Sequence, residues 1–138
     1  MMRFNRTATT IIIYLLIAVL NILTFGEYLK ATKLAGGEVG MIPIAMIIIF
    51  GITFLLSTIA FLIINSKKKI SIITSIFIYH IIYLGVLISW GFDFKNLTNL
   101  KYTNVDLFII LIPFLIWAIV SLVCKLWVSK WIEQNNQF

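Results

Sequence analysis

Cysteine is nearly missing from this sequence, which has Cys124 as its one cysteine among 138 residues. A disulfide within the chain needs two cysteines, as does a Cys-x-x-Cys redox centre, so both are excluded. Cys124 lies near the end of the last apolar stretch, where we expect a small apolar filler. Attachment of a lipid to a cysteine near the membrane boundary is the alternative interpretation.

Charged residues are also scarce, at 12% of the chain, which is about half of their usual fraction in a soluble domain. They are absent from four long stretches, residues 7–26, 39–66, 70–92 and 107–124. A helix of roughly 17 to 25 residues crosses the hydrocarbon layer of a bilayer, so each stretch is long enough for one span. The apolar fraction of 62% exceeds what a soluble domain of this size can bury. We therefore expect an all-α membrane protein.

The spacing of these stretches predicts one integral membrane domain over residues 1–138, with spans at approximately 8–28, 41–65, 70–92 and 107–129. The connection 66–70 is so short that the helices it joins must be antiparallel neighbours. The fold class that follows is an antiparallel bundle of four transmembrane helices. No small-x-small cleavage pattern follows the first apolar core, so we expect the first span to be an uncleaved signal anchor.

Basic residues are unevenly divided between the two sides that these spans would separate. Seven lie in the N-terminal segment, the 66–70 connection and the C-terminal tail, and four lie in the loops 27–38 and 93–106. Four of the five acids are in those two loops, so the net charge is +6 on one side and zero on the other. The positive-inside rule then predicts that both chain ends are cytoplasmic, in a multi-pass protein of the cell (inner, cytoplasmic) membrane.

The basic character of the chain does not indicate a nucleic-acid partner. Its positive charges are spread over three membrane-flanking segments, without a compact basic patch interleaved with aromatic residues. Topology and anionic lipid headgroups account for them. The abundance of Ile, Lys and Asn is typical of a bacterial chain.

Two prolines and three tryptophans mark positions along the predicted spans. Pro43 falls in the first turn of the second span, where its missing N–H costs least. Pro113 falls about two turns into the fourth span, which predicts a kink unless a neighbouring group bonds to the carbonyl that the proline frees. Trp90, Trp127 and Trp131 lie near the predicted membrane boundaries, where tryptophan commonly anchors a helix.

The loop 93–106 keeps five apolar residues between its charges: Phe94, Leu97, Leu100, Tyr102 and Val105. This pattern predicts a short amphipathic element at the membrane interface, or a cap on the bundle. A partner-binding loop is the alternative.

Each predicted span carries one stripe of polar or small residues at a spacing of three or four. Helices in lipid associate through such residues, so we expect the four stripes to meet in the bundle interior. The stripes are Thr10, Tyr14, Ala18 and Asn21; Thr53 and Ser57; Ser71, Ser75, Tyr79 and Tyr83; and Trp117 and Ser121. Helix packing is the first interpretation, and a hydrated pathway for a solute is the second.

His80 lies near the middle of the third predicted span and is the one histidine of the chain. An intramembrane histidine is a candidate for proton or ligand handling. A neutral histidine bonded to Tyr83, Tyr14 or Thr53 would instead be structural. With no carboxylate or second histidine at its depth, we expect no metal site and no cofactor. The candidate intramembrane polar site therefore comprises His80, Tyr83, Tyr14, Asn21, Thr53 and Ser57.

Function is predicted here mainly by exclusion. The predicted spans lack paired carboxylates and metal-binding motifs, so we expect no enzymatic activity and no catalytic residues. The sequence predicts a non-enzymatic polytopic membrane protein that acts by protein–protein interaction, as an accessory subunit or an immunity-type protein. Its partners would be the lipid bilayer and either another membrane protein or further copies of itself. The alternative is a small oligomeric transporter or channel subunit with a polar midplane around His80.

Overall fold

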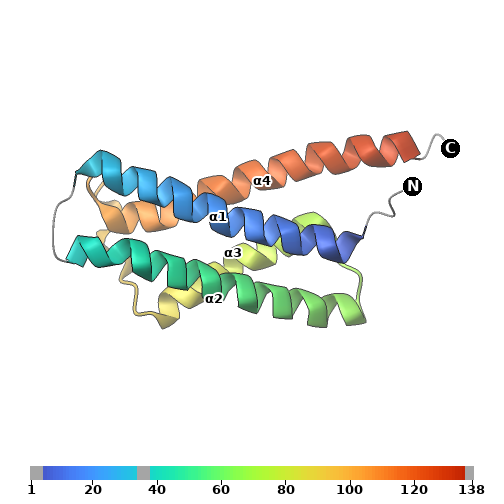
Figure 1. The fold of residues 1–138 in the computed structure, drawn as a ribbon, viewed down its shortest axis with the longest axis horizontal. Helices are drawn as coiled ribbons and strands as arrows, with labels where there is room; N and C mark the ends of the chain where they lie inside the picture. Colours follow the sequence, from blue (N-terminus) through green and yellow to red (C-terminus); the bar gives the residue numbers. More distant parts are fainter. Residues whose placement is uncertain (1–4, 34–37, 136–138) are drawn as a thin grey trace.

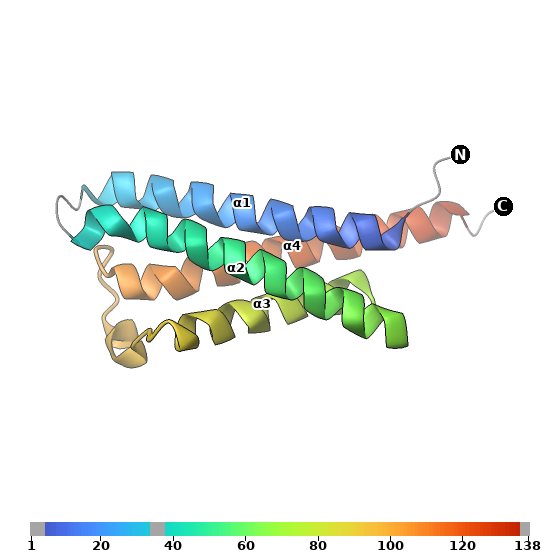
Figure 2. The ribbon, with the colours of Figure 1, turned by 60° about the horizontal axis from the view of Figure 1, so that its bottom comes forward.

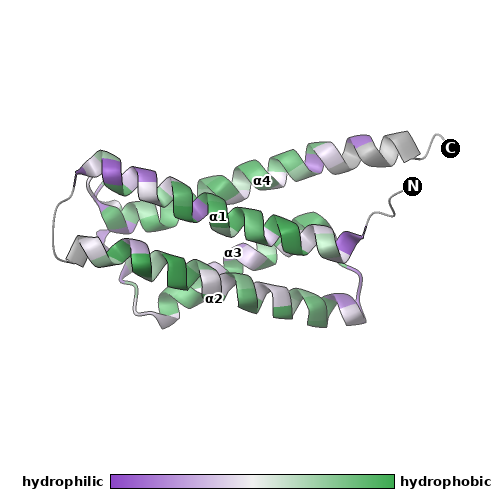
Figure 3. Ribbon diagram, in the orientation of Figure 1, coloured by the Kyte–Doolittle hydropathy of each residue, from purple (hydrophilic) through white to green (hydrophobic). Residues whose placement is uncertain are grey.

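Four long helices make up most of the computed structural model, which describes residues 5–33 and 38–135. They are α1 (Arg6–Thr32), α2 (Glu38–Lys67), α3 (Ile72–Ser89) and α4 (Val105–Asn135), and a short 3-10 helix, η1 (Phe94–Thr98), precedes α4 (Figure 1). Each long helix has the length and apolar composition needed to cross a membrane. Apolar residues predominate along these helices (Figure 3). The predicted all-α bundle of four transmembrane helices is confirmed.

Helices that follow one another in the chain run antiparallel and pack side by side (Figures 1 and 2). α4 also packs on α1, which closes the ring, and α1 contacts α3 across the bundle. Within the described residues α2 and α4 make no contact. The bundle is therefore flattened, with α1 and α3 meeting on its short diagonal.

Helix α1 begins and α4 ends at the same end of the bundle, together with the α2–α3 connection (Figure 1). We call this the basic end, because Arg6, Lys67, Lys68, Lys69, Lys125 and Lys130 belong to the segments that meet there. The opposite end, which carries η1, is the loop end. This arrangement is the one that an even number of spans requires. The assignment of the basic end to the cytoplasm stays a prediction from the charge distribution.

Helix α3 is shorter than the predicted span 70–92, for reasons visible at both of its ends. At its start, the Ser71 Oγ accepts a hydrogen bond of 3.0 Å from the Thr74 backbone N–H, which makes Ser71 the N-cap. At its end, Gly91 adopts a φ of 84°, a left-handed conformation that favours glycine and ends the helix. The span is therefore Ile72–Ser89.

Polar side chains order the connection between α3 and α4. The Asp93 carboxylate caps η1 by accepting from the Lys95 backbone N–H at 3.0 Å. The Asn104 Nδ2 donates to two backbone carbonyls, of Asn96 and Asn99, both at 2.7 Å. A short helical element thus lies where the sequence predicts an amphipathic one.

The outer surface of the bundle is covered by large aliphatic side chains, whereas polar groups lie inside. Exposed residues include Ile12 and Leu23 of α1, Ile59 of α2 and Ile119 of α4. This distribution is the reverse of that in a soluble protein, and it places lipid around the helices. The chain is therefore a multi-pass membrane protein in contact with the bilayer.

Candidate functional site

Polar residues of α1, α2 and α3 meet in the interior, as their spacing predicts. We call this group the interior seam: Thr10, Tyr14, Asn21, Thr53, Ser57, Ser75, Tyr79 and Tyr83. Each of these side chains is at most 3% exposed. The stripe of α4 is less deeply placed, since Trp117 and Ser121 are half-buried. Ser71 is exposed, because it caps α3 instead of extending the seam.

Tyr14 joins α1 to α3 at the centre of the seam. Its hydroxyl donates to the Ser75 backbone carbonyl at 2.8 Å. Its ring lies 5.1 Å from the ring of Tyr79 and 6.2 Å from that of Phe61, between centroids. Aromatic rings from three helices therefore occupy the interior at this level.

Tyr83 donates a hydrogen bond to a backbone carbonyl of α4 that lacks its helical donor because of Pro113. In a helix the Ile109 carbonyl would accept from the N–H of residue 113, which proline lacks. The Tyr83 hydroxyl donates to this carbonyl at 2.7 Å. Its ring also stacks on Phe50 of α2, with centroids 5.0 Å apart and an interplanar angle of 3°. The carbonyl freed by Pro113 thus has the neighbouring partner that membrane burial demands.

His80 lies at the edge of the interior seam, on the flank between α3 and α4. Its half-buried ring stacks on Trp117 at 5.4 Å and contacts Phe114 at 6.1 Å and the seam residue Tyr83 at 6.3 Å, between centroids. The sequence interpretation placed His80 among the interior polar residues, whereas the structure places it in an aromatic cluster that borders them. The reason is helical geometry, because His80 is turned by ~100° from Tyr79 and by ~60° from Tyr83.

The three predicted hydrogen-bond partners of His80 all donate elsewhere. The hydroxyls of Tyr14 and Tyr83 donate to Ser75 and Ile109, and the Thr53 Oγ1 donates to the Ile49 carbonyl at 2.8 Å. In residues 5–33 and 38–135, the His80 ring forms no hydrogen bond. In the described residues His80 thus borders the seam through the Tyr83 ring, without a hydrogen bond to the predicted polar midplane.

Several polar atoms of the interior have no hydrogen-bond partner in the described part of the chain. In the seam these are the Asn21 Oδ1, the Ser57 Oγ and the Tyr79 hydroxyl, and in α4 they are the Trp117 Nε1 and the Ser121 Oγ. All are uncharged groups. The described residues also include no group of three or more His, Cys, Asp or Glu that could hold a metal ion. The seam can therefore supply neutral hydrogen-bonding groups, but no charged group.

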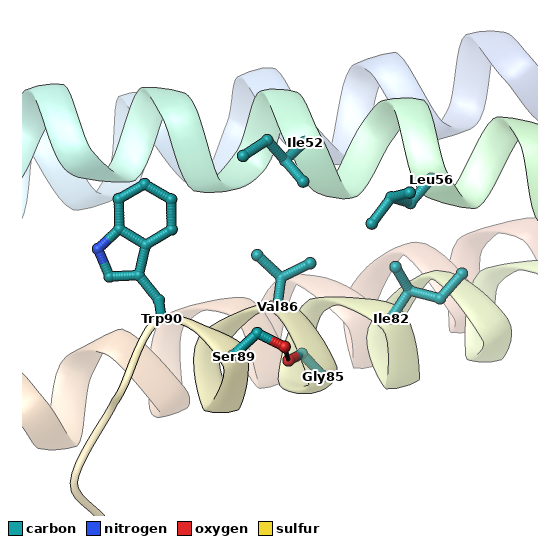
Figure 4. Close-up of a pocket in the computed structure, with 7 residues that line it drawn as sticks. All are labelled: Ile52, Leu56, Ile82, Gly85, Val86, Ser89 and Trp90. Atoms are coloured by element: carbon teal, nitrogen blue, oxygen red, sulfur yellow. Dashed lines mark hydrogen bonds between the residues drawn. The ribbon is translucent and has the colours of Figure 1, made fainter.

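A groove that the sequence reasoning missed lies between α2 and α3, beside the face of α3 that carries the seam. This α2–α3 groove has a volume of about 440 Å³ and is lined by Ile52, Leu56, Ile82, Gly85, Val86, Ser89 and Trp90. Figure 4 shows the α2 residues facing Ile82 and Val86 across the groove, with Trp90 at one end. It has the size and the largely apolar lining of a binding site.

Gly85 leaves space in the wall of this groove. A methyl group added at Gly85 would meet no heavy atom within 4 Å. The Ser89 Oγ, one turn further on, donates to the Gly85 carbonyl at 2.9 Å, so its hydroxyl is satisfied within α3. The four-residue spacing of Gly85 and Ser89 is the signal in the sequence that could have indicated this surface.

A second cavity continues from the groove toward the loop end. This loop-end pocket has a volume of about 300 Å³ and also includes Trp90 in its lining. Its apolar wall comes mainly from α2, and its two charged lining residues are Asp93 and Asp106. Trp90 thus stands between an apolar groove and an acidic pocket.

The chain matches no protein family, no curated protein and no solved structure among those compared. Its function must therefore be inferred from its own surfaces.

Proposed function

We propose that this protein acts without catalysis, as an accessory subunit or an immunity-type protein, by binding a transmembrane helix of a partner in the α2–α3 groove. The observation that carries this proposal is the open space at Gly85 in a groove that faces the bilayer. Small residues on a lipid-facing surface allow another helix to approach closely, and close packing drives association in lipid. Gly85 and Ser89 supply such a surface.

The interior supports this proposal better than it supports transport by a single copy. Tyr14, Phe61 and Tyr79 place their rings together where α1 and α3 meet. The polar groups there are neutral, and His80 lies outside them. The alternative, an oligomeric transporter or channel subunit, would need a polar path between copies, whereas the groove presents Ser89 as its one polar side chain.

We also propose that the basic end faces the cytoplasm, with the protein in the cell membrane. The support is the +6 to zero division of charge. In a Cys124→Ser background, a cysteine at Ser66 should be protected from an impermeant thiol reagent in intact cells, and one at Asn99 should react. Labelling of the Ser66 position from outside would reverse the orientation.

Photo-crosslinking tests the proposed helix partner. A benzophenone amino acid at Leu56, an exposed residue that lines the groove and leaves Gly85 unchanged, should capture a foreign membrane protein, identified by mass spectrometry after purification in mild detergent. The same amino acid at Leu23, an exposed lipid-facing residue of α1, is the matched control and should capture lipid only. Capture of a second copy of this chain from position 56 would instead support the oligomeric alternative.

A further inference from the structure

The α2–α3 groove and the loop-end pocket adjoin at Trp90, and we call the two together the cleft. Both include Trp90, and one face of α2 lines them in order, with Ile42, Met46 and Ile49 in the pocket followed by Ile52 and Leu56 in the groove. These positions recur every three or four residues, which is the spacing of a single helix face. The cleft therefore runs from the middle of the span to the loop end.

The two ends of this cleft differ in charge. Its groove part contains no charged residue, whereas Asp93 and Asp106 line the pocket part, and no basic residue is among the described residues that line it. The Asp106 Oδ2 accepts from the neutral Asn96 amide at 3.0 Å. The Asp93 Oδ2 lies 3.7 Å from the Lys95 Nζ in a solvent-exposed and therefore weak ion pair, with the Lys95 side chain 87% and the Asp93 side chain 60% exposed. Negative charge at the head of an apolar cleft favours an occupant with a positive group there.

From this charge complementarity, and resting on the function proposed above, we infer the chemistry of the partner: a transmembrane helix with a Lys or Arg that enters the loop-end pocket. This basic side chain would lie between the two carboxylates and near the Trp90 ring, which also attracts cations. The two carboxylates repel the anionic headgroups of membrane lipids, which favours a helix with a basic side chain over a lipid as the occupant.

The geometry of α2 also predicts where this basic residue falls in the partner. The centres of the groove and of the pocket are ~8 residues, or ~12 Å, apart along α2. The Lys or Arg should therefore be about two helical turns from the partner residue that packs on Gly85, toward the loop end.

Paired acid-to-amide substitutions test the inference. In the chain that carries the crosslinker at position 56, Asp93→Asn together with Asp106→Asn should lower partner capture about tenfold. Asparagine is itself a good N-cap, so η1 keeps its capping group at Asp93. Glu27→Gln is the matched control, because the Glu27 carboxylate pairs with Lys30 at 2.7 Å and does not line the cleft. It should leave capture unchanged.

The outcomes separate the inference from the function on which it rests. If the chain with the crosslinker at position 56 captures a partner helix and its Asp93→Asn, Asp106→Asn variant captures it equally well, the inference is wrong and the proposed function stands. A captured helix without Lys or Arg at the predicted position has the same meaning. Capture of a cationic lipid alone, or of nothing, from position 56 overturns both. Support would come from rescue, in which Asp106→Lys abolishes capture and a Lys→Glu or Arg→Glu change in the partner restores it.

Discussion

Helix α3 has two contrasting sides, one toward the interior seam and one toward the α2–α3 groove. On the seam side, Tyr79 packs on Tyr14, and Tyr83 donates a hydrogen bond to α4. On the groove side, Ile82 and Gly85 border open space, and Ser89 bonds only within its own helix. The contrast shows how the polar residues of this bundle are used. The polar residues join the helices of the bundle to one another. The groove side of α3, which stays open, presents apolar and small residues.

This difference between the seam side and the groove side of α3 follows from the lipid that surrounds the helices. Burial of aliphatic surface distinguishes little between a helix and lipid, so a membrane bundle gains specificity from interhelical hydrogen bonds and close contacts. Three tyrosines supply such bonds here, each to a backbone carbonyl of another element. Besides Tyr14 and Tyr83, the Tyr28 hydroxyl of α1 donates to the Tyr102 carbonyl at 2.8 Å. Substitutions on the seam side should therefore destabilise the bundle, and those on the groove side should affect binding alone.

The largest effect is expected for Tyr83→Phe. The substitution removes the hydroxyl and leaves the Ile109 carbonyl without a donor in a low-dielectric interior, at a cost of about 1 to 2 kcal/mol in the free energy of unfolding. Unfolding of the protein by SDS in bicelles, followed by tryptophan fluorescence, measures this loss.

A double-mutant cycle identifies the cause of that loss. Pro113→Ala restores an N–H that can donate to the Ile109 carbonyl, so Tyr83→Phe should cost much less in the Pro113→Ala background. An equal cost in both backgrounds would show that the hydroxyl stabilises the fold in some other way than by bonding to the freed carbonyl.

A smaller loss is expected for Tyr14→Phe. The Ser75 carbonyl that accepts from Tyr14 also has a helical N–H donor within α3, so it stays bonded after the substitution. We expect a loss of about 0.6 kcal/mol, the average for interhelical hydrogen bonds in a membrane protein. The same unfolding assay applies. A loss as large as that of Tyr83→Phe would contradict the distinction between the Ser75 carbonyl, which has a second donor, and the Ile109 carbonyl, which has none.

The sequence predicted the spans and most of the seam because both depend on local spacing. Charge-free stretches indicate the helices, and residues such as Tyr14, Thr53 and Ser57 repeat on one helix face. The repair of α4 at Pro113 was predicted as a requirement, but its donor could not be named, since Tyr83 reaches Ile109 only through the packing of α3 on α4.

Two features could not be derived from the same reasoning. His80 was grouped with the seam by its depth in the span, but depth does not specify the side of the helix to which a residue points. The groove depends on how far apart α2 and α3 lie toward the loop end, which is a property of three-dimensional packing that the spacing of Gly85 and Ser89 alone does not contain.

A still smaller effect is expected at His80, on the flank of α3 that faces α4. If His80 were hydrogen-bonded, as the structural interpretation of the sequence predicts, His80→Gln would be milder than His80→Leu, because an amide could replace the hydrogen bond. Since the ring contacts Trp117, Phe114 and Tyr83 without a hydrogen bond in the described residues, we expect both to cost about 0.5 kcal/mol, as these aromatic contacts are lost. A clear advantage of Gln over Leu in the unfolding assay would show that the imidazole has a polar partner.

The smallest change in stability should come from Ser57→Ala, which tests whether the seam excludes water. The Ser57 side chain is fully buried and its Oγ has no hydrogen-bond partner in the part of the chain that the structure describes, whereas the Ser75 Oγ donates to the Ile72 carbonyl at 2.6 Å. Removal of an unpaired buried hydroxyl costs no hydrogen bond, and alanine is the better helix former, so stability should be unchanged or rise by about 0.5 kcal/mol. Ser75→Ala is the matched control, and it should not be more stable than the wild type.

If Ser57→Ala instead lowers stability by about 1 kcal/mol or more, the hydroxyl must be hydrogen-bonded in the membrane, for example to internal water. The seam would then be hydrated, and the contrast with the groove would favour the alternative of a transporter or channel subunit.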